Sequence, residues 1–299
     1  MRLGIGLPAA VPGTPPAAVG DWAEAGERLG FRSLAVLDRL VYDNLDPLIA
    51  LAAAAERTEH AELMTTILGV PWRDNPVVLA KQLASLDRLA GGRLTAGLAI
   101  GGWPEDHGVS ELPPGGTGAR FDAMLTAMGR VWAGEVAGAA GPMPALPAGR
   151  PALLLGGLAP AALTRAAVRS DGWIAPFFGY EMLVDGAAAV RRAWDDAGRP
   201  GAPRIVAERY FCLGPDADTT ADEYLAHYYG RAWAGAAMAD TLRSGDALLT
   251  ELARLAAAGC DDLLLFPCAG DLGQLERLAD VVAAWPAFSA QDLAVASEH

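Results

Sequence analysis

Hydrophobic positions along the chain alternate between two patterns, one with helical spacing and one of short, almost uncharged apolar runs. Both are clearest within residues 79–103. Residues 94–100 predict a strand buried on both faces, and Gly91 and Gly92 separate it from a helix that precedes it. The predicted helix carries one apolar stripe with three- or four-residue spacing, formed by Leu79, Leu83, Leu86 and Leu89. If this helix-to-strand unit repeats along the rest of the chain, the fold contains a parallel sheet covered by helices.

The same alternation recurs over the whole chain and predicts a (β/α)8 barrel. Predicted strands lie at 2–8, 32–38, 62–70, 94–100, 152–157, 172–177, 204–213 and 261–267. Predicted helices lie at 17–29, 47–56, 76–90, 120–132, 159–169, 181–197, 247–258 and 272–285, with a further helical region around Thr219. Such alternation calls for a parallel sheet covered by helices, and eight units close it. We expect one domain over residues 1–299.

An open doubly wound sheet is the alternative architecture. It would carry a G-x-G-x-x-G loop after the first strand, where this chain reads GIGLPA. Two segments rich in Pro and Gly, 104–120 and 134–151, interrupt the period. Loops of this length are commonly functional or mobile.

Composition narrows the classes of partner. The net charge of -13 argues against nucleic acid and against anionic membranes, both of which need a basic surface. No run approaches the roughly 18 apolar residues of a membrane helix, and the first residues lack a signal-peptide pattern, so we expect a cytoplasmic protein. Cys212, Cys260 and Cys268 lack metal-ligand spacing and are expected to be small core residues; no metal site is predicted.

Four segments carry a family resemblance. Residues 79–103, 153–177, 30–40 and 67–82 resemble the bacterial luciferase-like family of flavin-dependent oxidoreductases. The resemblance implies a (β/α)8 barrel that binds FMN, or its deazaflavin relative coenzyme F420, at the carboxyl ends of the strands. The chain is short for this family, so the family's insertions are expected to be reduced here.

The resemblance implies a phosphate site at the glycines that follow the fifth strand. Here the strand passes into a helix, so free N–H groups and the helix dipole would face an anion. The residues concerned are Gly156, Gly157, Leu158 and Ala159. Family members often have serine where this chain has Ala159, so phosphate would depend on backbone donors helped by a basic side chain from elsewhere. A simple tight turn is the structural alternative.

Further cofactor contacts are expected at the ends of other strands. At Gly69 and Val70 the resemblance implies a cis peptide bond against the flavin ring. Gly101 ends the fourth strand, and Phe177 is an aromatic residue that could wall the ring. Asp38 closes the second strand. Trp103, Trp173 and Phe178 are further aromatic residues at strand ends.

Arg39 and His107 are the candidate catalytic residues. F420-dependent relatives often carry histidine where this chain has Arg39, which cannot transfer protons near neutral pH but can stabilise an anionic oxygen. Its alternative role is an ion pair with Asp38 or Asp43. His107 lies in the long loop, where it could transfer protons or simply be solvated. His60 is expected at the opposite end of the barrel.

Glu208 and Arg209 place two charges inside an otherwise apolar strand. Because a barrel interior seldom holds an unpaired charge, they either pair with each other or point to the mouth.

The family resemblance therefore implies a monooxygenase that uses reduced FMN and dioxygen on a small organic substrate. The resemblance adds a separate flavin reductase and a homodimer as expected partners. The alternatives are hydride transfer with coenzyme F420 and a non-catalytic flavin-binding protein.

Overall fold

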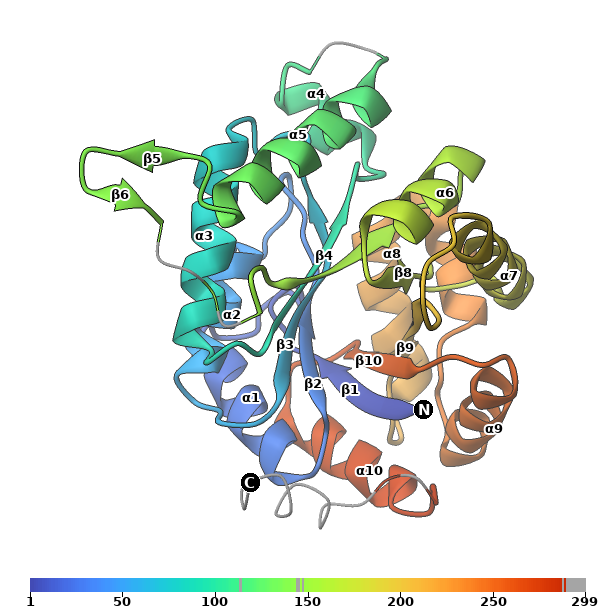
Figure 1. The fold of residues 1–299 in the computed structure, drawn as a ribbon. Helices are drawn as coiled ribbons and strands as arrows, with labels where there is room; N and C mark the ends of the chain where they lie inside the picture. Colours follow the sequence, from blue (N-terminus) through green and yellow to red (C-terminus); the bar gives the residue numbers. More distant parts are fainter. Residues whose placement is uncertain (113–114, 144–145, 147, 287, 289–299) are drawn as a thin grey trace.

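Eight parallel strands close into a barrel, in which each strand pairs with the next barrel strand along the chain and the first pairs with the last (Figure 1). The structure is a computed structural model that describes residues 1–112, 115–143, 146, 148–286 and 288. The barrel strands are β1 Arg2–Gly6, β2 Ser33–Val36, β3 Glu62–Gly69, β4 Leu94–Ala99, β7 Ala152–Gly156, β8 Gly172–Ile174, β9 Arg204–Phe211 and β10 Asp262–Pro267. The predicted (β/α)8 barrel is confirmed, and the open sheet is excluded.

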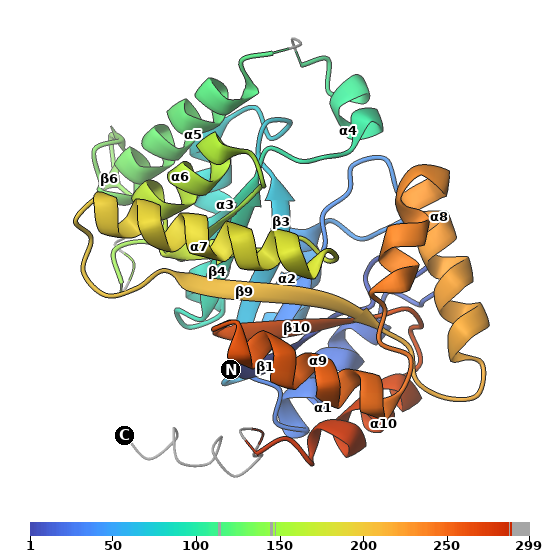
Figure 2. The ribbon, with the colours of Figure 1, turned by 90° about the vertical axis from the view of Figure 1, so that its right-hand side faces the viewer.

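Helices surround the barrel (Figures 1 and 2). They are α1 Ala18–Arg28, α2 Pro47–Ala55, α3 Pro76–Leu89, α4 Pro104–Val109, α5 Thr117–Trp132, α6 Pro160–Arg169, α7 Tyr180–Asp196, α8 Ala217–Ala239, α9 Gly245–Ala257 and α10 Leu272–Val282. The start of α3 follows from its sequence, because the Asn75 side chain accepts hydrogen bonds from the N–H groups of Val77 and Val78. Pro76 occupies the first turn, where no N–H is needed. Among the described residues, no helix is long and apolar enough to span a membrane.

Three local expectations need correction. Leu89 is 49% exposed, so it does not belong to the buried stripe of α3. The loop expected at 104–120 contains α4 and the start of α5, since a proline suits a helical first turn as well as a loop. In the segment 134–151, β5 Ala137–Gly138 and β6 Gly141–Pro142 form a short hairpin apart from the barrel sheet. His299 and the rest of 289–299 lie outside the described residues.

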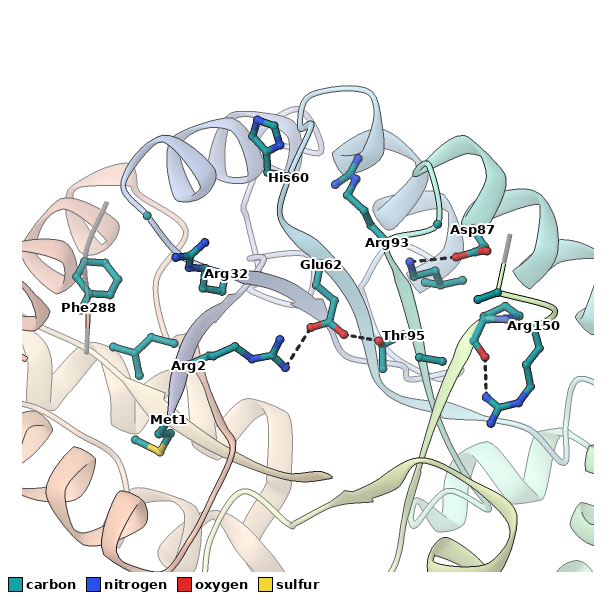
Figure 3. Close-up of a pocket in the computed structure, with 17 residues that line it drawn as sticks. Met1, Arg2, Arg32, His60, Glu62, Asp87, Arg93, Thr95, Arg150 and Phe288 are labelled. Atoms are coloured by element: carbon teal, nitrogen blue, oxygen red, sulfur yellow. Dashed lines mark hydrogen bonds and ion pairs between the residues drawn. The ribbon is translucent and has the colours of Figure 1, made fainter. Parts of the chain in front are cut away.

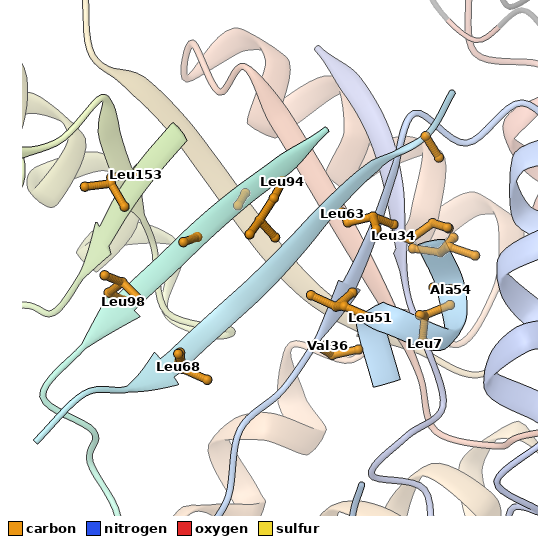
Figure 4. Close-up of a cluster of buried hydrophobic side chains, with 14 of the residues drawn as sticks. Leu7, Leu34, Val36, Leu51, Ala54, Leu63, Leu68, Leu94, Leu98 and Leu153 are labelled. Carbon is orange, nitrogen blue, oxygen red and sulfur yellow. The ribbon is translucent and has the colours of Figure 1, made fainter. Parts of the chain in front are cut away.

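The core has an outer layer between strands and helices and an inner layer along the barrel axis. In the outer layer, Leu51 of α2 packs beside Leu34 and Leu63 of two neighbouring strands (Figure 4). The inner layer includes Met64, Val206 and Leu264. The three cysteines are buried and free, as predicted.

Charged side chains fill the amino-terminal end of the barrel. Arg204 donates hydrogen bonds to Glu62 at 2.6 and 2.8 Å and to Asp262 at 2.7 Å. Arg2 also binds Asp262, and Glu62 lies between Arg2 and Thr95 (Figure 3). His60 lines a cavity of about 660 Å³ at this end, as expected. Ion pairs thus occupy the amino-terminal end of the barrel, while the carboxyl ends of the strands, where (β/α)8 proteins hold their sites, lie at the opposite end.

Candidate functional site

A cavity of about 530 Å³ opens at the carboxyl ends of the strands. Its size is that of a site for a small organic molecule or cofactor, and carbon atoms make up most of its wall. Among the predicted cofactor contacts, its lining includes Asp38, Gly69, Gly101, Gly156, Gly157, Leu158, Ala159 and Phe177. Val70, Arg39 and His107 do not line it. The strand ends thus bring most of the predicted contacts together around one space.

The predicted phosphate corner has no room for side chains. A Cβ atom on Gly156 would lie 2.2 Å from Ile67 Cδ1, and one on Gly157 would lie 2.8 Å from the Ala162 Cβ. Gly157 also has a φ of +121°, which favours glycine. The helix α6 begins directly after this turn, and its N-cap residue Ala159 makes no side-chain cap. Backbone N–H groups are therefore the donors available to a ligand at this corner.

Arg165 is the basic side chain that the sequence could not locate. It lies on α6, lines the cavity and binds Asp122 through hydrogen bonds of 2.7 and 3.1 Å. Its position three residues after Ala162 places both on the same face of the helix. That spacing is the signal by which it could have been found.

The cis peptide bond lies between Thr66 and Ile67, and not at Gly69–Val70 as expected. The pairing of β3 with β4 shifts register over this segment, which moves the irregularity away from the strand end. Gly69 instead makes room for Trp72, because a Cβ atom there would lie 1.7 Å from the indole Cζ2. Val70 belongs to the outer core and donates its N–H to the Ala99 carbonyl, so it faces away from the cavity.

Trp72 forms a wall that sequence reasoning missed. Its indole also lies over Gly101, where a Cβ atom would be 2.1 Å from Cη2. The indole Nε1 is buried and has no hydrogen-bond partner among the described residues. His107 packs edge-on against Trp72, with ring centroids 5.3 Å apart, and its Nε2 is 3.3 Å from the Gly101 carbonyl oxygen. The structure therefore places His107 behind the wall.

Asp38 organises the rim between β2 and β3. Its carboxylate accepts the Gly69 N–H at 2.9 Å and contacts the Arg73 guanidinium at 3.2 Å. Burial raises the pKa of Asp38, although Arg73 and the Gly69 N–H act in the opposite direction. These contacts hold the end of β3 in place beside the cavity.

Arg39 is ion-paired, but not with Asp38 or Asp43. Its guanidinium lies 3.6 Å above the ring of Trp103 and faces Asp106 at 3.4 Å and Glu105 at 3.6 Å. A hydrogen bond of 3.3 Å to the Tyr228 carbonyl links it to α8. Because Trp103 lines the cavity and Arg39 does not, the arginine supports the aromatic wall from behind.

Aromatic rings form much of the remaining wall. Phe177 stacks on Tyr210 with centroids 4.4 Å apart, and the Tyr210 hydroxyl is 3.1 Å from that of Tyr229. Trp103 packs edge-on against Tyr228 of α8, which agrees with the position of α4 and α8 on one side of the barrel (Figure 2). Trp173 is fully buried and does not line the cavity. Flat rings suit the binding of another flat ring system.

Glu208 and Arg209 point to opposite sides of β9. Arg209 faces the helix layer, where its guanidinium binds Glu251 at 2.9 Å. Glu208 lines the cavity, is 2% exposed, and has one carboxyl oxygen, Oε1, without a hydrogen-bond partner among the described residues. Burial raises the pKa of Glu208 well above its usual value, against the smaller effects of Thr66 and the Arg209 charge. The two residues do not pair with each other.

The cavity meets three requirements of a flavin: apolar walls, donors for the ring and an anion corner. Buried polar atoms without partners, namely Trp72 Nε1, Thr66 Oγ1 and Glu208 Oε1, belong to residues that line it. Within the described part of the chain, no group of three or more His, Cys, Asp and Glu residues could hold a metal ion. The apolar walls, the unpaired polar atoms and the glycine corner of the cavity fit an organic cofactor with an anionic tail.

A closed parallel barrel with a cavity at the carboxyl ends of its strands has the architecture of a (β/α)8 enzyme. The luciferase-like monooxygenase family matches residues 1–290, and the chain belongs to that family.

Curated relatives match part of the chain. An uncharacterized protein of Mycobacterium tuberculosis H37Rv is 32% identical over 176 residues, which are 54% of this chain and 61% of that protein. The chain thus spans about 61% of the length of the first curated relatives it matches.

Two solved structures share the fold. One is the oxygenating constituent of 3,6-diketocamphane monooxygenase from Pseudomonas putida in complex with FMN, with a TM-score of 0.75, 16% identity and coverage of 95% of this chain and 97% of that chain. The other is an F420-dependent secondary alcohol dehydrogenase in complex with an F420–acetone adduct, with a TM-score of 0.79, 16% identity and coverage of 95% and 99%. At this identity the likeness is one of fold.

Proposed function

We propose that this protein is a flavin-dependent monooxygenase that binds reduced FMN in the upper cavity and oxygenates a small organic substrate. The observation that carries the proposal is the arrangement of polar and apolar groups around that cavity. Its lining includes a glycine corner beside Arg165 that suits an anion, aromatic side chains, and buried polar atoms that have no hydrogen-bond partner within the described parts of the chain. FMN in the complex of the diketocamphane monooxygenase supports the choice of cofactor.

Each part of the cavity has a role in this proposal. The backbone N–H groups at Gly156 to Ala159 and the guanidinium of Arg165 would hold the phosphate. Trp72, Trp103 and Phe177 would contact the ring and exclude water from it. Reduced flavin supplies the electrons that activate dioxygen, and the protein orients the ring and shapes the substrate space. A separate reductase would supply reduced FMN, and we expect a homodimer.

Hydride transfer with coenzyme F420 is the second candidate, because an F420-dependent dehydrogenase shares the fold. The position after Asp38 argues against it. Arg39 is always charged and is held behind Trp103 by Asp106 and Glu105, so it does not reach the cavity.

An anaerobic titration with reduced FMN and, separately, with reduced F420 tests the proposal. We expect tight binding of reduced FMN, followed on admission of oxygen by reoxidation at a rate that differs from that of free reduced FMN in stopped-flow absorbance. Binding of reduced F420 alone would favour the second candidate. Binding of neither cofactor would contradict both.

Arg165→Ala should weaken FMN binding about 10-fold or more, because charged hydrogen bonds to phosphate contribute roughly 1.5–3 kcal/mol. Arg169→Ala is the matched control, since Arg169 lies on the same helix and also contacts Asp122 but does not line the cavity. Isothermal titration of both variants measures the difference. Equal affinities would place the phosphate elsewhere.

A further inference from the structure

Glu208 and Thr66 come from opposite sides of the barrel. In the closed strand order β1-β10-β9-β8-β7-β4-β3-β2, β9 and β3 are separated by three strands in either direction. Along β9, Val206 and Tyr210 belong to the inner layer, so Glu208 between them also points to the axis. Thr66 lines the same cavity from β3. Its hydroxyl lowers the pKa of the Glu208 carboxyl, against the larger effect of burial.

The side chains of Glu208 and Thr66 are buried, and each has a polar atom without a hydrogen-bond partner among the described residues. Glu208 is 2% exposed and Thr66 is 1% exposed. Neither Glu208 Oε1 nor Thr66 Oγ1 has a hydrogen-bond partner among the described residues. A buried polar atom without a partner costs roughly 1–3 kcal/mol, so a ligand that supplies the partner recovers that cost.

The groups around Glu208 do not neutralise a carboxylate. Thr66 approaches from β3, and the phenol of Tyr229 from α8, and both are uncharged. Tyr210, which faces the same layer from β9, is hydrogen bonded to Tyr229. Arg209 is the neighbouring cation, and its guanidinium is bound to Glu251 on the other side of the strand. Burial in this setting raises the pKa of the Glu208 carboxyl and favours its protonated form, which can donate a hydrogen bond.

We propose that Glu208, as the donor, and Thr66 together bind a carbonyl oxygen of the flavin ring on the axis of the barrel. The inference rests on the proposed function and assigns the ring end of the cofactor to this pair. A neutral acceptor fits here because the basic side chain of the cavity, Arg165, lies on α6 beside the glycine corner. Glu208 is therefore a positioning residue that fixes the ring while the glycine corner fixes the tail.

The affinity for oxidised FMN, measured by fluorescence quenching between neutral and alkaline pH, tests the pair. In the wild type the affinity should be constant near neutrality and fall as Glu208 loses its proton, because a carboxylate cannot donate and repels a carbonyl oxygen. Glu208→Gln keeps an N–H donor and cannot ionise, so its affinity should stay within about 3-fold of the wild type and be independent of pH. Glu208→Leu should bind about 5-fold more weakly at neutral pH.

Thr66→Val removes the hydroxyl with little change of shape and should weaken binding about 3-fold or more. Thr65→Val is the matched control, since the Thr65 hydroxyl donates to the Gly97 carbonyl and does not line the cavity. Its FMN affinity should equal that of the wild type.

Infrared difference spectra of the protein without ligand give a second readout. The wild type minus Glu208→Gln spectrum should show the band of a protonated carboxyl at neutral pH, and the band should vanish at alkaline pH. Absence of this band, or wild-type affinity in Glu208→Leu, would overturn the inference while FMN binding still upholds the proposed function. Failure of the wild type to bind either oxidised or reduced FMN would overturn both.

Discussion

Arg39 shows how the surroundings of one residue decide its role. From the sequence it is a candidate to stabilise an anionic oxygen, but its guanidinium is sandwiched between Trp103 and two carboxylates, and Asp106 is completely buried. Arg39→Ala should lower the free energy of unfolding by about 3 kcal/mol, because it leaves a buried carboxylate without its cation. Urea unfolding monitored by circular dichroism measures the loss.

The double variant Arg39→Ala/Asp106→Asn is the control for this prediction. Removing the charge of Asp106 should recover part of the stability, because the neutral amide can still accept the hydrogen bond that the Val41 N–H gives to Asp106. A loss below about 1 kcal/mol in the single variant would show that the pair contributes little, as surface ion pairs do.

Local motifs allowed part of the site to be predicted. Gly156 and Gly157 lie where a strand passes into a helix. The glycine pair and the boundary between strand and helix can both be recognised from neighbouring residues in the sequence. The orientation of Glu208 could not be predicted in this way. Apolar residues occupy both faces of β9, so the sequence pattern does not show which residues point into the barrel. Trp72 reaches the cavity through contacts with Gly69 and Gly101, and the second of these is distant in sequence.

At the scale of elements, α8 is divided by a kink at Gly230 just after the two tyrosines of the cavity wall. Its φ of 61° and ψ of −174° lie in a region that only glycine adopts readily. Gly230→Ala should therefore lower the free energy of unfolding by about 1–3 kcal/mol, although the added methyl group would meet open space.

Gly235→Ala is the matched control within the same helix. Gly235 also has open space around it and lies in the helical part of α8, so alanine should raise stability by about 0.5–1 kcal/mol. Chemical denaturation of both variants decides the matter. Equal effects of the same sign would show that the backbone at Gly230 is not strained by a side chain.

The boundaries of elements were less predictable than their existence. The predicted strand 172–177 stops at Ile174, and Phe177 already belongs to the loop that lines the cavity. Apolar residues occur in both places because the strand and the cavity wall are both shielded from water, although Phe177 is only partly buried. The short helix α4 was hidden for a similar reason, since its Pro104 and Gly108 are common in loops.

At the scale of the molecule, the two ends of the barrel have separate tasks. Arg204→Ala should lower the free energy of unfolding by about 1.5–3 kcal/mol, because Glu62 and the fully buried Asp262 lose one of their two shared arginines and keep only Arg2. The folded fraction should bind FMN with unchanged affinity, since the network lies at the opposite end from the cavity. Denaturation and FMN titration of one preparation test both statements. A tenfold loss of affinity would show that the ends are coupled.

Barrel closure was the part of the fold that depended most on long-range contacts. The number of strand–helix units can be counted along the chain, but closure requires β1 to pair with β10, and Arg2 to reach Asp262. Periodicity does not report that contact. The count of eight units, together with the family resemblance, supplied the prediction of closure.

The opposite orientation of Glu208 and Arg209 also bears on how β9 finds its alignment. A register shift of one residue against β8 and β10 would place the Arg209 guanidinium in the apolar interior of the barrel. It would also place the Glu208 carboxyl next to Glu251. Two acidic groups would then face each other, and a cation would be stranded. This arrangement would cost free energy, because it buries a cation without a partner and brings two carboxyl groups together. The two adjacent charges therefore favour one register for β9, whose other buried side chains are apolar on both faces.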